Sequence, residues 1–250
     1  MTDTINSEVL HHARPPSSDS TSREVLPGEI DGFRTVSHAL VPGATVELAG
    51  PAEKGRGYLF RSGRGRVDDG DTTHPLEEVA LFAPQHGTTA SVTATEELLF
   101  LELIVDLTAT DLTEFEQNAE KYPFFLSYSD CKTYRERIKS AKTISRTLLP
   151  EHTFPRLCVG SVETTGDDRV AAHEHPMLEQ LFLGLQDNEC VVQADAATAA
   201  FGEGVLLHIP LASRHGVEVH KPHRLHYIWI DLFRNREGMQ WIVQEHIKES

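Results

Sequence analysis

Three histidines and one glutamate are spaced in the sequence so that they could bind a metal ion. His173 and His175 are two residues apart, so both side chains point to the same face if this segment is a β-strand. Glu179 would lie ~13 Å beyond His175 on an extended strand, which is too far to share an ion. We therefore expect the chain to turn at Pro176 and to return with Glu179 on the neighbouring strand. His215, in a later hairpin, would complete the set.

Three imidazoles and one carboxylate suit a divalent transition metal and leave one or two coordination positions for water or substrate. Any one of these histidines alone is more often a hydrogen-bonded core or surface residue than a ligand. The combined spacing is hard to explain by packing alone, so it predicts one divalent transition metal per chain, which could be Mn, Fe, Zn, Ni or Co. Such an open site can act as a Lewis acid on a substrate carbonyl or enediolate.

A proton-transfer reaction at this site would also need a base near the substrate. The candidate catalytic residues are His208, Tyr227 and Glu174, with His226 as a further possibility. His208 alternates with Leu207 and Ile209, so it lies on the opposite face of its strand from these apolar residues. His226 and Tyr227 are adjacent on a predicted strand, and only one of them can face the interior. The sequence leaves open which face that is.

Composition and charge exclude several classes of function. The chain has 250 residues, a hydrophobic fraction of 39% and a formal net charge of −15, so it should be repelled by phosphate backbones and anionic lipid surfaces. The sequence has no apolar run of membrane length, and we expect neither a membrane span nor a secretory leader. We expect a cytoplasmic protein with a small-molecule substrate, and no nucleic-acid or membrane partner. Cys131, Cys158 and Cys190 are too widely spaced for a zinc knuckle, and we expect buried thiols.

The hydrophobic pattern divides the chain into five parts. Residues 1–25 are polar and proline-rich and are expected to be a disordered tail. Short β-rich runs with glycine-containing turns fill residues 26–108 and recur over 151–234, which indicates an internal duplication. Residues 109–150 are expected to be a helical linker, and residues 235–250 an amphipathic helix against a barrel. Exposed edge strands favour a homodimer.

The β-rich segments resemble cupins, in particular bicupins. YLFRSGRGRV followed by EEVALFAPQHG is similar to a cupin hairpin and the strand after it, and the second half is similar to the two cupin motifs, GxxxxxHxHxxx(x)E and GxxxxxPxGxxHxxxN. On these motifs His173, His175, Glu179 and His215 fall on the four ligand positions. Gly166 stands one residue early, and Ala212 and Val219 replace the motif's Gly and Asn. The resemblance implies an all-β fold with a few helices, built from two tandem cupin (jelly-roll-like) β-barrels.

The first half lacks a HxH pair where a cupin would carry one, so the resemblance implies a first barrel without metal. The whole chain resembles metal-dependent bicupin enzymes such as the deoxyuronate isomerases, and more weakly ureidoglycine aminohydrolase, whose ligand set differs. We therefore expect an isomerase that acts on a sugar acid or a related hydroxy- or keto-carboxylate. The alternatives are an iron-dependent cupin dioxygenase, a cupin lyase, or a non-catalytic module that binds a small carbohydrate.

Overall fold

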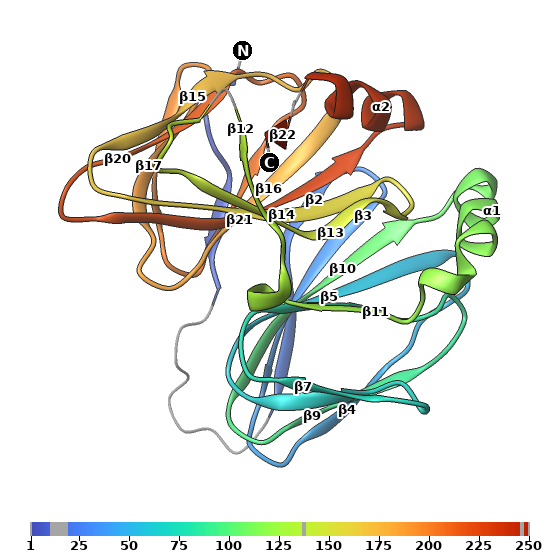
Figure 1. The fold of residues 1–250 in the computed structure, drawn as a ribbon. Helices are drawn as coiled ribbons and strands as arrows, with labels where there is room; N and C mark the ends of the chain where they lie inside the picture. The colour runs from blue at the N-terminus through green and yellow to red at the C-terminus, as the bar shows by residue number, and fades with distance from the viewer. Residues whose placement is uncertain (1, 11–19, 137–138, 246–247, 250) are drawn as a thin grey trace. The chain divides into compact units, whose positions relative to one another are not determined.

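The structure is a computed structural model that describes residues 2–10, 20–136, 139–245 and 248–249. The chain forms two compact units, which are described separately (Figure 1). The N-terminal unit is Ala13–Cys131. The C-terminal unit combines Lys132–Ser250 with the beginning of the chain, Met1–His12.

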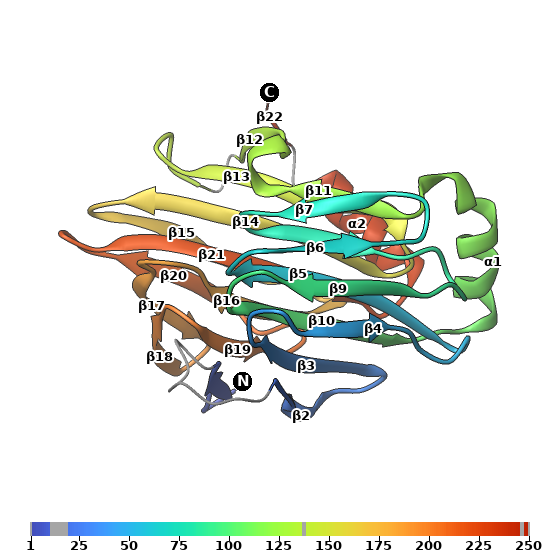
Figure 2. The same cartoon turned by 90° about the horizontal axis from the view of Figure 1, so that it is seen from below.

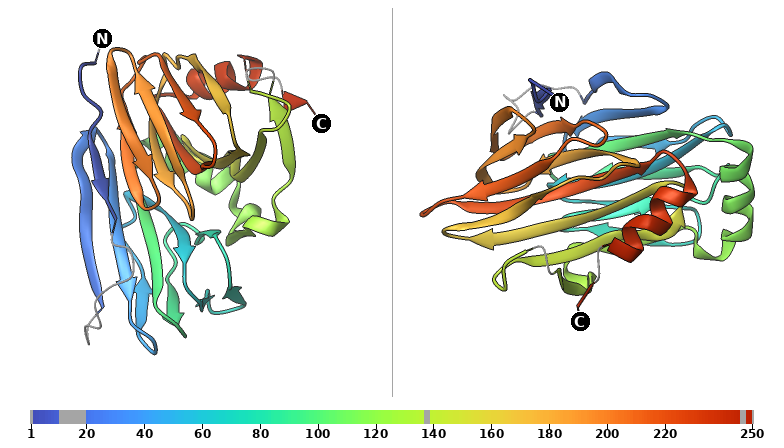
Figure 3. Two further views of the ribbon diagram at one scale, coloured as in Figure 1. Left: turned by 90° about the vertical axis from the view of Figure 1, so that its left-hand side faces the viewer. Right: turned by 90° about the horizontal axis from the view of Figure 1, so that it is seen from above.

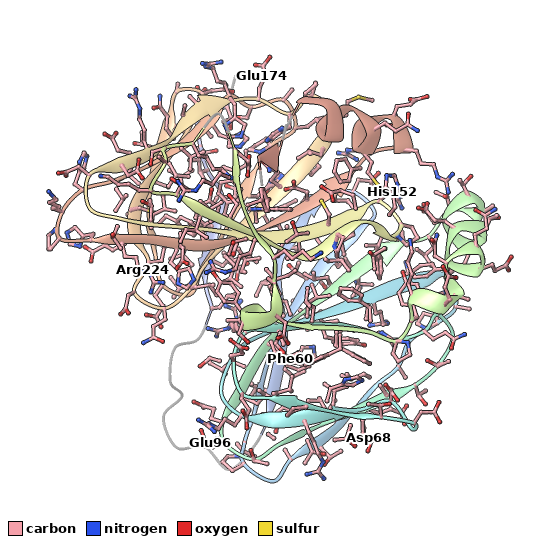
Figure 4. The ribbon with its side chains drawn as sticks, viewed as in Figure 1. Phe60, Asp68, Glu96, His152, Glu174 and Arg224 are labelled. Atoms are coloured by element: carbon pink, nitrogen blue, oxygen red, sulfur yellow. The ribbon has the colours of Figure 1, made fainter. Side chains whose placement is uncertain are left out.

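The N-terminal unit consists of two antiparallel sheets packed around an apolar core. The larger sheet runs in the order β11 (Phe124–Ser127), β8 (Ala80–Ala83), β5 (Lys54–Ser62), β10 (Leu98–Asp106), β3 (Phe33–Leu40) and β2 (Thr21–Ile30). The smaller sheet runs β4 (Thr45–Leu48), β9 (Ala90–Ala94), β6 (Gly65–Asp68) and β7 (Thr73–Leu76). Phe60, Phe82 and Phe100 are fully buried between the sheets, and Figure 4 shows Phe60 within this unit.

The C-terminal unit repeats this plan. Its larger sheet runs β1 (Ser7–Val9), β19 (Val205–Ile209), β16 (Leu178–Gly184), β21 (Arg224–Phe233), β14 (Leu157–Thr165), β13 (Ile144–Phe154), β12 (Thr133–Glu136) and β22 (Lys248–Glu249). Its smaller sheet runs β15 (Asp168–His173), β20 (His215–Val219), β17 (Glu189–Ala194) and β18 (Ala197–Gly202). The long strands β14, β21 and β16 lie side by side in Figure 2, and Figure 3 shows the same sheet from two further directions.

The strand orders of the two units correspond one to one. The order β8-β5-β10-β3-β2 in the first unit matches β19-β16-β21-β14-β13 in the second, and β4-β9-β6-β7 matches β15-β20-β17-β18. Each unit is therefore a jelly-roll-like barrel with the same connectivity. The expected all-β fold of two tandem barrels is confirmed.

Helices are short and lie outside the sheets. They are α1 (Ala109–Gln117), α2 (Arg236–Glu245) and the 3-10 turns η1 (Ala119–Lys121) and η2 (Tyr128–Asp130). A capping box starts α1, because Thr108 Oγ1 accepts from Asp111 N (3.2 Å) and Asp111 Oδ2 accepts from Thr108 N (2.8 Å). Met239 of α2 is buried in a cluster with Leu178 and Phe233, which fixes this helix against its barrel.

The segments outside the predicted barrels contain more strand than expected. Residues 7–9 form β1 and pair with β19, while β2 begins at Thr21 and pairs with β3, so these parts of the expected disordered tail are in sheets. Residues 11–19 lie outside the described part. The expected helical linker contains β11, β12 and the start of β13, and among its described residues the α-helix is confined to the first third.

All three cysteines are buried free thiols, as the sequence indicated. Over the described residues, no helix combines the length and the apolar character needed to cross a membrane.

Candidate metal centre

Three histidines converge at one end of the C-terminal barrel. His173 ends β15, His215 begins β20, and the two residues face each other across the antiparallel ladder. His175 follows in the loop after β15. One ring nitrogen from each of the three lies within 4.8 Å of the others, and His175 and His215 are buried. This arrangement gathers three nitrogen donors around one point.

Backbone carbonyls orient two of these rings. His173 Nδ1 lies 2.8 Å from the carbonyl of Ala171, and His215 Nδ1 lies 3.0 Å from the carbonyl of Ser213. A carbonyl only accepts, so Nδ1 carries the hydrogen in each ring and Nε2 keeps its lone pair for a metal. The ring centroids are 4.6 to 5.3 Å apart. Both the donor type and its orientation therefore fit a divalent transition metal.

Two local features bring His173 and His215 into register. The β15–β20 ladder is irregular between Val170 and His173, and such a bulge re-aims the side chains that follow it. Gly216 follows His215 at the closest approach of the two strands, where an added Cβ would meet the carbonyl of Val170 at 2.9 Å. A larger residue at 216 would push the two strands apart and separate the histidines.

Glu179 is not part of this cluster, which corrects the expected geometry. Among the described residues, the group of close potential ligands contains the three histidines and does not include Glu179. Side chains alternate along β16, and Gln180 and Phe182 line the pocket beside the histidines. Glu179 therefore points to the opposite face of the sheet.

On that face Glu179 is hydrogen-bonded to residues before and within the loop that leads to His215. Glu179 Oε2 accepts hydrogen bonds from His208 Nε2 (3.1 Å) and from the backbone N–H of Leu211 (2.9 Å), and Oε1 accepts from Arg234. Ala212, which follows Leu211 in this loop, donates its N–H to the carbonyl of His175 (3.2 Å). Burial opposes the charged form of Glu179, but the hydrogen bonds from His208 and Arg234 hold its pKa below the ordinary value. We conclude that Glu179 braces the loop that leads to His215.

The histidines open into a pocket inside the barrel. It holds about 620 Å³ of space free of atoms, part of which is open to solvent. Tyr227, Trp229 and Asp231 of β21 line it, so this set of alternating residues faces the interior and His226 faces away. The pocket walls also include aromatic and aliphatic groups, among them Tyr134, Phe182 and Val217.

Charged groups in the pocket were not found from the sequence. Lys139 Nζ lies 2.5 Å from Glu136 Oε1, and both side chains are more than nine-tenths buried. Asp231 Oδ1 accepts a hydrogen bond from Gln180 Nε2 (2.8 Å). Burial raises the pKa of Asp231 to about 7. Acidic residues are frequent in this chain. Only the alternation of side chains along each strand could have indicated that Glu136 and Asp231 face the pocket.

The expected catalytic residues fall in three different places. Tyr227 lines the pocket and is completely buried, and burial raises its pKa well above 10. His208 is buried on the opposite face of the sheet with Glu179, so it does not line the pocket. Glu174, between His173 and His175, is exposed and points away from its barrel in Figure 4. These positions favour Tyr227 over the other two.

Comparison with known proteins identifies the fold. No protein-family model matches the sequence, and no curated protein matches it significantly. Among solved structures, a cupin 2 conserved barrel domain protein from Leptotrichia buccalis is 14% identical with a TM-score of 0.62, and the match covers 89% of this chain and 92% of that one. For oxalate decarboxylase from Bacillus subtilis the values are 16%, 0.68, 94% and 77%.

An IolB-like protein from Salmonella typhimurium is also similar, with 16% identity, a TM-score of 0.67, and coverage of 88% of this chain and 94% of that protein. At these identities the likeness concerns the fold. Together with the duplicated strand order and the histidines on β15 and β20, it leads to one conclusion. The chain has the cupin fold twice, as two tandem barrels, and the histidine cluster lies in the second.

Proposed function

We propose that the C-terminal barrel binds one divalent transition metal through His173, His175 and His215, and that it catalyses a metal-dependent reaction on a small polar metabolite. The observation that carries this proposal is the convergence of three ring nitrogens within 4.8 Å at a pocket lined by both apolar and charged groups. A bound ion would act as a Lewis acid toward a carbonyl or enediolate oxygen. The cupin likeness is consistent with such a site.

The pocket supports a substrate of the sugar-acid or hydroxy- and keto-carboxylate class. It combines apolar walls with a few charged and polar groups, as sites that bind small molecules usually do. Trp229 and Phe182 offer flat apolar walls, while Lys139 offers a buried cation within reach of a substrate carboxylate. Neutral imidazoles would leave the ion's charge uncancelled, which also favours an anionic oxygen donor.

Isomerase-type proton transfer remains the reaction that we favour, with the proton-transfer groups reassigned. Glu136 and Asp231 are carboxylates that line the pocket, whereas His208 and Glu174 do not. Tyr227, whose pKa is raised by burial, stays protonated at neutral pH and could donate a hydrogen bond to a substrate oxygen. Positioned carboxylates and a protonated phenol are the pair of groups that a proton shift between neighbouring carbons requires.

A lyase is the second candidate. Oxalate decarboxylase, by its name, acts on a small carboxylate, and its structure overlaps 94% of this chain. The two reactions differ in their products, because a decarboxylase releases carbon dioxide and an isomerase conserves mass. An oxygen-dependent reaction would differ from both in its need for dioxygen.

Elemental analysis of the purified protein tests the metal site. We expect close to one transition-metal ion per wild-type chain and a large loss in His215→Ala. His220→Ala is the matched control, because His220 lies in the same barrel with its side chain 67% exposed, and we expect it to keep its metal. Equal metal in wild type and His215→Ala would overturn the proposal.

A further inference from the structure

We infer that Gln180, rather than a carboxylate, supplies the fourth protein contact to the metal of the C-terminal barrel. This inference rests on the proposed three-histidine site and adds a residue to it. It replaces the carboxylate ligand expected at Glu179 with a neutral amide oxygen.

The side chain of Gln180 has a buried amide oxygen that lacks a hydrogen-bond partner among the described residues. Gln180 is 5% exposed, and its Oε1 atom accepts no hydrogen bond from the described residues. Leaving a buried acceptor unsatisfied costs about 1–3 kcal/mol, so most such groups in proteins have a partner. A metal ion in the pocket would satisfy this atom.

A hydrogen bond to Asp231 fixes the direction of the Gln180 amide. Gln180 and Asp231 face each other across the β16–β21 ladder, and Gln180 Nε2 donates to Asp231 Oδ1 at 2.8 Å. An amide has its nitrogen and oxygen on opposite sides, so this bond turns Oε1 away from Asp231. Asp231 is thus a positioning residue that sets which end of the amide is offered to the pocket.

Gln180 also lies on a strand that passes beside the histidines. Gln180 lines the same pocket as His173, His175 and His215. Phe182, on the same face of β16 two residues further on, has its ring centroid 5.8 Å from that of His215. The strand that carries Gln180 therefore passes directly beside the cluster.

The donor set has a chemical consequence. Three imidazoles and one amide carry no charge, so a divalent ion would keep its full charge, whereas a carboxylate ligand would halve it. Replacing Gln180 by Glu should therefore strengthen metal binding, and replacing it by Ala should weaken it. The two substitutions have opposite expected signs, which a purely structural role for Gln180 does not predict.

The test uses the full-length protein, stripped of metal with a chelator and reloaded with Co²⁺. Visible absorption reports the Co²⁺ ligands, and competition with a coloured chelator gives the affinity. We expect Gln180→Ala to bind Co²⁺ at least about tenfold more weakly. Gln180→Glu should bind more tightly and change the visible spectrum. Asp231→Leu, which removes the acceptor that orients the amide, should weaken binding about tenfold.

Gln193→Ala is the matched control, because Gln193 is an exposed glutamine in the same barrel. Thermal unfolding of each metal-free variant separates loss of a ligand from loss of the fold. An unchanged affinity and spectrum in Gln180→Glu would overturn the inference and leave the three-histidine site standing. Failure of the wild type to take up Co²⁺ would overturn both.

Discussion

The two barrels have the same strand order but different residues at the position of the metal cluster. In the C-terminal barrel His173 on β15 pairs with His215 on β20, next to the Val170 and Val217 pair along the ladder. In the N-terminal barrel the equivalent strands are β4 and β9, and there Leu48 pairs with Ala90, which are both buried in the apolar core. One cross-strand pair therefore distinguishes a histidine cluster from a packed interior.

The corresponding strands of the two larger sheets each also carry a polar cross-strand pair. Tyr58 faces Glu102 across β5 and β10, as Gln180 faces Asp231 across β16 and β21. Glu102 forms ion pairs with Arg56 and His38, so its charge is compensated within the N-terminal unit. Gln180 instead keeps an unsatisfied oxygen in a pocket. A polar pair between corresponding strands is thus compensated by ion pairs in one barrel and leaves an unsatisfied acceptor in the other.

The largest expected effect is on the packed barrel. Phe60→Ala removes a fully buried ring from the N-terminal core and should lower the free energy of unfolding by about 3–5 kcal/mol. Denaturant unfolding measures this loss. Phe124→Ala, at a half-buried position on β11, should cost clearly less. If the packed barrel is only structural, folded Phe60→Ala protein should keep its metal content; loss of metal would contradict the separation of roles.

Removing the loop brace of the C-terminal barrel should have the next largest effect. Glu179→Ala leaves buried His208 and the N–H of Leu211 without their acceptor, and we expect a loss of about 2–3 kcal/mol in denaturant unfolding. The variant should also bind metal more weakly, because the loop before His215 is no longer held. Glu218→Ala removes an exposed carboxylate of β20 and serves as control. Equal stability of the two variants would refute a bracing role.

The site was only partly readable from the sequence, for a physical reason. The spacing of His173 and His175 fixes their common face, so grouping them with His215 needed only one strand pairing, and the structure brings all three together. The alternation of side chains along β15 does not continue across the loop at Pro176, and β16 is buried on both faces. In a strand without alternating polar and apolar residues, the sequence does not indicate which side chains point to which face. It therefore could not show whether Glu179 or Gln180 faces the pocket.

The same reason applies to β21, which is buried along nearly its whole length, so the choice between His226 and Tyr227 needed coordinates. The barrels themselves could be predicted, because glycine-containing turns and short β-rich runs recur in both halves. The pairing of β1 with β19 could not be predicted, because a strand of three residues, SEV, has too little pattern to indicate a partner on the far side of the sequence.

A smaller, pH-dependent effect should appear in the N-terminal barrel. Burial raises the pKa of Glu102, but the hydrogen bond from His38 and the charge of Arg56 outweigh burial and hold it below the ordinary value of 4.5. A carboxyl whose folded pKa is depressed stabilises the fold above its unfolded pKa and loses this contribution as the pH falls through the folded pKa. Stability should therefore fall below pH 4.5, and Glu102→Gln should flatten this part of the profile. Parallel profiles would contradict the assignment.

The smallest effect is expected at an exposed ion pair. Arg64 and Glu96 lie 3.6 Å apart with side chains 57% and 64% exposed, and Figure 4 shows Glu96 at the edge of its barrel. Glu96→Ala should change the free energy of unfolding by less than about 0.5 kcal/mol, because water and salt screen such pairs. Denaturant unfolding at low and high salt measures this change. A loss above about 1.5 kcal/mol would show that this exposed ion pair contributes more to stability than we expect.

The most direct test of the difference between the barrels is to locate the ion. Crystals of the metal-loaded protein, measured with X-rays at the absorption edge of the bound element, would show where it scatters anomalously. We predict one strong peak per chain, in the C-terminal barrel among His173, His175 and His215, and none beside Leu48 and Ala90. A peak in the N-terminal barrel, or none at the three histidines in crystals of protein that contains the metal, would contradict it.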